Sequence, residues 1–277
     1  MSPDGKRLAV TTEDNVVSTY ELSAGGALQR LTFGNKNSNP VWSRPDGKYL
    51  FFTSDRDGES VLYQQLADGT GVAEALTTPE KDVLPLAESV ESSGKVLAFT
   101  KRQGAQASVW FLPLDGDRKP KPLVNAPSGA QSHAAFSSNG RWLAYTSTEL
   151  RADRPQIFVQ PYPSTGEKHQ VSTDGGTYPL WSPDGKQLFY LWDDQFYVVD
   201  VRTETPFSVS KPSKLPITGI IQPPRSQRNY DITPDGKQFL AVVLASAQGE
   251  TNLRLPRAQL NVVLNWFEEL KQRVPQH

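Results

Sequence analysis

The chain has 277 residues, a formal net charge of -1 and no cysteine. The near-neutral charge argues against nucleic acid or an anionic membrane as the main partner, because both require concentrated positive charge. The absence of cysteine excludes disulfides, thiolate metal sites and thiol nucleophiles, and no apolar run is long enough to cross a membrane as a helix.

A short turn motif recurs along the whole chain. Ser-Pro-Asp-Gly-Lys occupies residues 2–6, closely similar copies stand at 45–48, 182–186 and 233–237, and altered copies stand at 92–95 and 138–141. The glycines of these six copies are 42 to 51 residues apart. A period near 45 residues with turn residues at fixed places is typical of β-propeller blades.

The residue types of the motif explain the turn. Proline presets φ for the second turn position, and glycine then accepts a positive φ at low cost. We therefore interpret Asp4, Asp46, Asp184 and Asp235 as turn residues and not as catalytic acid pairs.

The segments around each turn predict four strands per repeat. A small inner strand precedes the turn (40–42, 134–136, 179–181), and an apolar central strand follows it (49–52, 96–99, 142–145, 187–190, 238–242). A third strand (61–63, 109–112, 157–159, 196–199) and a short outer strand (28–32, 73–77, 121–124, 168–172) complete most repeats. The sequence predicts an all-β fold, a single six-bladed β-propeller of four-stranded antiparallel blades. The blades span about 1–35, 36–79, 80–126, 127–174, 175–218 and 219–266.

The first and last blades are expected to be incomplete. Met1 stands where later repeats have Trp42, Phe136 or Trp181, so the first blade lacks its inner strand. Residues 260–266 read as the third strand of the last blade, and 267–274 have the apolar spacing of a short amphipathic helix. One hypothesis is that residues upstream, in a longer parent protein, complete the ring.

The repeats resemble the WD-repeat-like propeller motif of the TolB family, in which an apolar strand follows a Ser-Pro-Asp-Gly-Lys core. Residues 261–271 also resemble the C-terminal ends of bacterial TolB-like propeller proteins, many of them fused behind a serine/threonine kinase domain and a membrane helix. This resemblance implies a protein-interaction or sensing region in an extracytoplasmic, periplasmic setting.

Catalytic motifs are missing from the sequence. It contains no Gly-x-Ser-x-Gly elbow, no kinase motif, no phosphate-binding glycine loop and no zinc-binding helix motif. We therefore expect no catalytic residues, no metal and no cofactor. Residues 55–59 contain three carboxylates that could hold calcium, but a polar hairpin turn explains them better.

Candidate binding residues gather where the inner strands begin. Alignment of the repeats places Asn39, Ala87, His133, Tyr178 and Asn229 at equivalent positions near the mouth of the central channel, where propeller loops converge. The predicted ligand- or partner-binding residues are Asn37, Asn39, His133, Tyr178, Arg225, Arg228, Asn229 and Tyr230. A plainer interpretation is that these side chains satisfy backbone groups around the channel.

These features favour a non-catalytic binding module that presents the channel mouth to a protein or peptide, or to a small molecule. Two alternatives remain open. One is a propeller enzyme, a hydrolase or lyase acting in the channel, which would need several converging carboxylates or histidines. The other is the regulatory region of a kinase-fused receptor, which a transmembrane helix and kinase motifs upstream would support.

Overall fold

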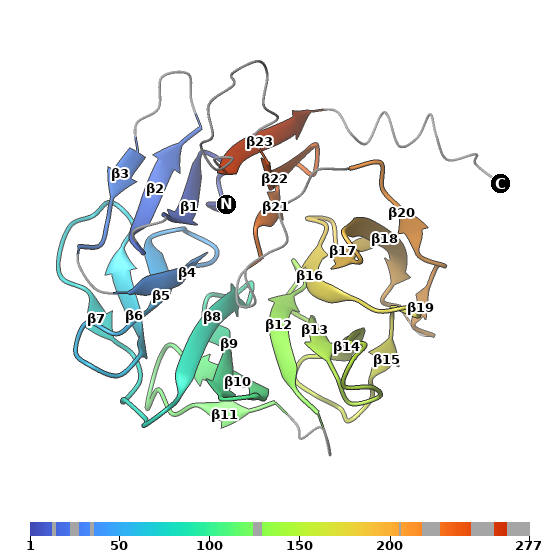
Figure 1. Cartoon of the computed structure of the whole chain (residues 1–277), viewed down its shortest axis with the longest axis horizontal. Helices are drawn as coiled ribbons and strands as arrows, with labels where there is room; N and C mark the ends of the chain where they lie inside the picture. The colour runs from blue at the N-terminus through green and yellow to red at the C-terminus, as the bar shows by residue number, and fades with distance from the viewer. Residues whose placement is uncertain are drawn as a thin grey trace, which may run out of the picture.

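The computed structural model describes residues 1–12, 15–22, 28–33, 36–123, 129–204, 206–217, 228–244 and 258–264. In these residues the chain is all-β, without a helix, and forms six antiparallel sheets. Figure 1 shows the sheets arranged radially around a centre, with β4, β8, β12, β16 and β21 nearest to it. The all-β propeller fold predicted from the repeats is confirmed.

Four of the sheets contain four or five strands, and the chain passes from the channel outward in each. They comprise β4 (Asn37–Trp42), β5 (Tyr49–Ser54), β6 (Val61–Leu66) and β7 (Glu74–Ala75); β8 (Leu84–Val90), β9 (Val96–Gln103), β10 (Gln106–Pro113) and β11 (Lys121–Pro122); β12 (Gln131–Phe136), β13 (Trp142–Ser147), β14 (Gln156–Pro161) and β15 (His169–Gln170); and β16 (Thr177–Trp181), β17 (Gln187–Trp192), β18 (Gln195–Arg202), β19 (Ser208–Val209) and β20 (Ser213–Lys214).

The first and last sheets have three strands each in the part of the chain that the structure describes. The first contains β1 (Arg7–Thr11), β2 (Val17–Glu21) and β3 (Leu28–Arg30), and the last contains β21 (Tyr230–Ile232), β22 (Gln238–Leu244) and β23 (Ala258–Leu264). The strand expected near 260–266 is confirmed as β23. The helix predicted for 267–274 lies outside the described residues.

The core lies between the faces of neighbouring sheets. Phe189 and Phe196 of the fifth sheet pack against Phe239 of the sixth, with ring centroids 5.9 and 4.8 Å apart in edge-to-face arrangements. All three side chains are fully buried. Each sheet thus buries its faces against the next, which stabilises a repeat fold without disulfides.

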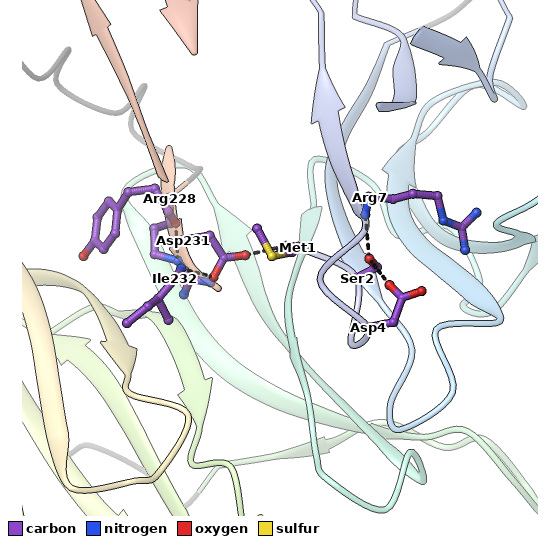
Figure 2. A network of polar contacts seen from close by, with 8 residues as sticks. Met1, Ser2, Asp4, Arg7, Arg228, Asp231 and Ile232 are labelled. Carbon is purple, nitrogen blue, oxygen red and sulfur yellow. Dashed lines mark hydrogen bonds and ion pairs between the residues drawn. The ribbon is translucent and has the colours of Figure 1, made fainter. Parts of the chain in front are cut away.

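The repeated turn is held by side-chain hydrogen bonds. In the first copy, which Figure 2 shows, the Ser2 hydroxyl donates to Asp4 Oδ1 at 2.6 Å and accepts the Arg7 N–H at 2.9 Å. Asp4 Oδ1 also accepts the N–H of Lys6 at 3.1 Å. The six turn glycines have φ between 63° and 78°, so the predicted positive-φ turn is confirmed in every copy.

Neighbouring turns also touch one another around the ring. A Cβ added to Gly47 would lie 2.8 Å from Pro3 Cδ, and one added to Gly94 would lie 2.0 Å from the Arg44 carbonyl oxygen. A Cβ on Gly5 would lie 3.0 Å from Pro234 Cδ, so the first turn packs on the last. The motif therefore also sets how closely adjacent sheets approach.

We expect Asp184→Ala to lower the free energy of unfolding at pH 7 by about 1 kcal/mol, because Asp184 accepts hydrogen bonds from the Ser182 hydroxyl (2.6 Å) and the Lys186 N–H (3.1 Å). Burial alone would raise the pKa of Asp184, but these hydrogen bonds outweigh it and lower the pKa. The stabilisation is therefore present above the ordinary value of 3.8 and is lost as pH falls through the lowered pKa. Urea unfolding at pH 7 and pH 3 checks this, and a difference that persists unchanged at pH 3 would contradict it.

Candidate binding site in the central channel

The aligned inner-strand positions lie at β-bulges. The pairing register shifts between Ser38 and Val41 in β4, and the equivalent shift occurs in β12 and β16. At these bulges Asn39, His133 and Tyr178 have φ of 54°, 57° and 56°. Asparagine tolerates this left-handed region, histidine does so less well, and a bulky tyrosine adopts it rarely. The three sheets therefore share the same backbone conformation at this position, while the side chain differs from sheet to sheet.

The same positions surround one cavity of about 400 Å³ in the centre of the ring. Six of the eight predicted binding residues line it: Asn39, His133, Tyr178, Arg228, Asn229 and Tyr230. They come from β4, β12, β16, the start of β21 and the two residues that precede it. The volume is within the range of small-ligand sites.

Two predicted residues are not part of this cavity wall. Asn37 is 1% exposed and bonded within the first two sheets: its Nδ2 donates to the Asn15 carbonyl at 3.1 Å, and its Oδ1 accepts from Arg56 at 3.4 Å. Arg225 lies outside the described residues. A binding role for either remains a prediction.

A second cavity of about 470 Å³ adjoins the first on the side of the repeated turns. The two cavities share Met1, Pro40, Val41, Glu88, Arg228 and Asp231 in their walls. They are thus two chambers of one central channel. Between them lies a ring of residues that includes two carboxylates and one guanidinium.

Glu88 bridges two sheets inside the channel. Its Oε1 accepts the N–H of His133 at 2.8 Å, its Oε2 accepts the N–H of Ala134, and the Thr100 hydroxyl donates to Oε1. The β12 bulge makes this possible, because it leaves His133 and Ala134 out of the ladder with β13. Burial outweighs these bonds and the nearby Arg228 charge, and raises the pKa of Glu88 to about 7.

Asp231 is the other carboxylate of the channel. It forms an ion pair with the Met1 amino group and accepts the Ile232 N–H at 2.9 Å, as Figure 2 shows. Burial would raise the pKa of Asp231, but the Met1 ammonium, the Arg228 charge and these hydrogen bonds lower it. Asp231 therefore holds a negative charge inside the protein.

Aromatic rings form one side of the first chamber. The rings of His133 and Tyr178 are in contact, with centroids 3.9 Å apart. The Tyr230 hydroxyl donates to the Tyr178 carbonyl, and Arg228 Nη1 donates to the Pro179 carbonyl at 3.2 Å. Burial raises the pKa of Tyr178 to about 12, so its hydroxyl stays protonated at neutral pH. This wall of the chamber therefore offers aromatic surface for stacking, next to the Arg228 guanidinium that its hydrogen bond holds in place.

Glu88 and Asp231 were not among the binding residues predicted from the sequence. In a regular strand, the neighbour of a channel-facing residue points to the opposite face. A bulge in β8, between Ala87 and Ser89, breaks that alternation, so Ala87 and Glu88 both line the channel. The signal available in the sequence was that the carboxylate of Glu88 directly follows Ala87, one of the aligned inner-strand positions.

Two further observations concern metals and membranes. No group of three or more histidine, aspartate or glutamate side chains in the described ranges is arranged to hold a metal ion. Among the same residues, no helix is long and apolar enough to cross a membrane.

No protein-family model matches the chain. An uncharacterized protein of Agrobacterium fabrum is 31% identical over 87 residues, which is 30% of this chain and 29% of that protein's length.

Several solved structures match over most of the chain. A protein assigned as TolB from Agrobacterium tumefaciens has a TM-score of 0.62 at 18% identity, covering 77% of this chain and 79% of that one. TolB from Acinetobacter baumannii has a TM-score of 0.66 at 18% identity, covering 95% of this chain and 62% of that one. The β-propeller domain of Cps50 (Swd1) from Myceliophteria thermophila has a TM-score of 0.60 at 15% identity, covering 96% and 81%.

An enzyme has a similar fold. Oligogalacturonate lyase in complex with manganese has a TM-score of 0.60 at 14% identity, covering 97% of this chain and 73% of that one. At these identities the likeness concerns the fold alone. The chain therefore has the fold of a TolB-like, WD-repeat-like β-propeller.

Proposed function

We propose that this propeller is a non-catalytic binding module whose central channel receives part of a protein or peptide partner. The observation that carries the proposal is that Asn39, His133 and Tyr178, on three different sheets, project from strained bulges around one cavity. Strained backbone and bulges are frequent at ligand sites, where they direct side chains. Likeness to TolB structures supports an interaction role in an extracytoplasmic setting, as part of a larger protein.

The channel chemistry suits a polypeptide ligand. Arg228 can bind a carboxylate or carbonyl group, and the His133 and Tyr178 rings can stack against apolar or planar groups. Asn39 and Asn229 each carry both a donor and an acceptor. A small molecule with the same groups would use the same wall.

The test uses a phage-displayed library of random heptapeptides selected on the full chain. Peptides so obtained should bind the Tyr178→Asn variant at least tenfold more weakly, because the aromatic surface is lost. Asparagine preserves the bulge, since Asn39 holds the same backbone conformation at the equivalent place. Tyr20→Ala is the matched control: Tyr20 is 36% exposed and lies outside both chambers. Peptides that bind both variants as tightly as the wild type would place the site elsewhere and contradict the proposal.

A second candidate is an enzyme acting in the same channel. Glu88 favours it, because a carboxyl with a pKa of about 7 can exchange a proton with a substrate at neutral pH. Incubation with oligogalacturonate, with and without Mn²⁺, should give no unsaturated product. Product formation that is lost in Glu88→Gln would favour the enzyme instead.

A further inference from the structure

A third cavity, of about 440 Å³, lies between the second and third sheets. One wall comes mainly from the segment that joins β7 to β8, and the other comes from β9, β10 and residues 117–120, which precede β11. Figure 1 shows β7 and β11 on the outer side of the ring. None of the described residues in these walls lines either chamber of the channel. The cavity is therefore a separate candidate site.

The inside of this cavity is apolar and partly aromatic. Leu76 and Phe99 are buried in its wall. Trp110 of β10, which also lines it, is only half-buried. The counterparts of Trp110 in the second and fourth sheets are Tyr63 and Phe158, which pair with the central strand at the same place and are buried. The third sheet thus presents an aromatic ring that is less covered than the equivalent rings beside it.

The rim of the cavity carries two ion pairs that join the two sheets. Lys101 Nζ lies 4.9 Å from the Trp110 ring centroid and pairs with Glu80, and Arg118 Nη1 pairs with Glu74 at 2.7 Å. In both pairs the carboxylate is the more exposed partner, at 54% and 56% against 23% and 35% for the cations. Because exposed ion pairs contribute little to stability, a ligand anion can take the place of such a carboxylate at low cost.

Charge and backbone conformation at the rim also favour an anionic ligand. The described wall contains three cations and two carboxylates, a net charge of +1: Lys101, Arg118, Lys119, Glu80 and Asp117. Arg118 has a φ of 47°, in the left-handed region that a bulky residue rarely adopts. Strained backbone of this kind is frequent at ligand sites, where the surrounding structure holds it in place.

We propose that this cavity binds a small molecule that combines a planar ring system with a carboxylate. The ring system packs beside Trp110 and against Leu76 and Phe99, and the carboxylate replaces Glu80 at Lys101. The volume is within the range of small-ligand sites. Contact between rings supplies affinity, and the charge-assisted bond to Lys101 fixes the orientation. This site is independent of the proposed function, because it uses none of the channel residues.

The probes are 2-naphthoate, a fused ring system with a carboxylate, and 2-naphthamide, which has the same shape without the charge. We expect 2-naphthoate to bind the full chain saturably in isothermal titration calorimetry and to shift the Trp110 indole N–H signal in a proton–nitrogen NMR spectrum. Trp110→Phe identifies that signal by its loss. The amide should bind at least tenfold more weakly. Equal binding of the two probes, or no saturable binding of 2-naphthoate, would overturn the proposal.

Two lysine variants test the position of the carboxylate. Lys101→Met removes the charge and keeps an apolar stem of similar length, so 2-naphthoate should bind at least tenfold more weakly while 2-naphthamide is unaffected. Lys168→Met is the matched control. Lys168 lies 5.2 Å from the Phe158 ring centroid and pairs with Glu149, but it does not line this cavity. Its variant should bind both probes as the wild type does, and equal losses at the two lysines would contradict a site at Lys101.

A gain of affinity provides a test that damage to the fold cannot imitate. Glu80→Gln removes the carboxylate that competes for Lys101, so 2-naphthoate should bind at least threefold more tightly, and unchanged or weaker binding would contradict the competition. Tyr178→Asn, which alters the channel, should leave 2-naphthoate binding unchanged. Loss of binding in Tyr178→Asn but not in Lys101→Met would place the probe in the channel, which would overturn this inference and leave the proposed function standing.

Discussion

Gly94→Ala is expected to lower the free energy of unfolding by about 4 kcal/mol. Two costs combine at this residue. Its φ of 78° lies in the left-handed region, which penalises any Cβ. The added Cβ would also lie 2.0 Å from the Arg44 carbonyl oxygen of the neighbouring sheet, so backbone must shift. Urea unfolding followed by circular dichroism measures the loss.

Gly104→Ala is the matched control for the first of these costs. Gly104 has a φ of 58° but no atom within 4 Å of an added Cβ. We expect this variant to lose only about 1 kcal/mol. Equal losses at Gly94 and Gly104 would show that contact between neighbouring turns contributes nothing to stability.

Glu88→Ala is expected to lower the free energy of unfolding by about 3 kcal/mol, because it removes the acceptor of three hydrogen bonds at once. The N–H groups of His133 and Ala134 cannot return to the β13 ladder while the bulge persists. Thermal and urea unfolding at pH 6 should show the loss. Thr146→Ala is a comparison in the same region, since Thr146 shares a longer, 3.3 Å contact with His133. An equal loss in both variants would contradict a special role for the carboxylate.

The Glu88 carboxyl also makes stability depend on pH. The pKa of Glu88 is raised by burial to about 7 in the folded chain, against an ordinary value of 4.5. The folded state therefore binds the proton more tightly than the unfolded chain does. This contribution is complete below pH 4.5 and is lost as pH rises through 7, and the shift amounts to about 3 kcal/mol. The corresponding slope should disappear in Glu88→Gln, and an unchanged slope would assign it to other groups.

The fold could be predicted from the sequence because the residues that form the repeated turns act locally. Proline, aspartate and glycine specify the turn through φ and through hydrogen bonds two residues away, so Gly5 and Gly185 are identifiable without any tertiary information. The strands beside each turn follow from apolar runs. All five inner-strand positions from the alignment, among them His133 and Tyr178, line one chamber.

Features that depend on long-range pairing could not be predicted in this way. A bulge shifts register against a partner strand, and nothing in a single strand's alternation reveals it. For that reason Glu88 was not predicted as a channel residue. It contacts β12 across a separation of 45 residues. The ion pair between Asp231 and Met1 joins residues that are 230 positions apart in the sequence. Asn37 forms hydrogen bonds with Asn15 and Arg56.

The contact between Gly5 and Pro234 has a mechanical consequence. At the other five joints of the ring, a continuous backbone links the two turns that touch. At this joint packing and the ion pair of Met1 with Asp231 hold the first turn beside the last. In the part of the chain that the structure describes, an occupant of the channel that pressed outward would therefore meet covalent links at five joints and only non-covalent contacts, packing and one ion pair, at the sixth.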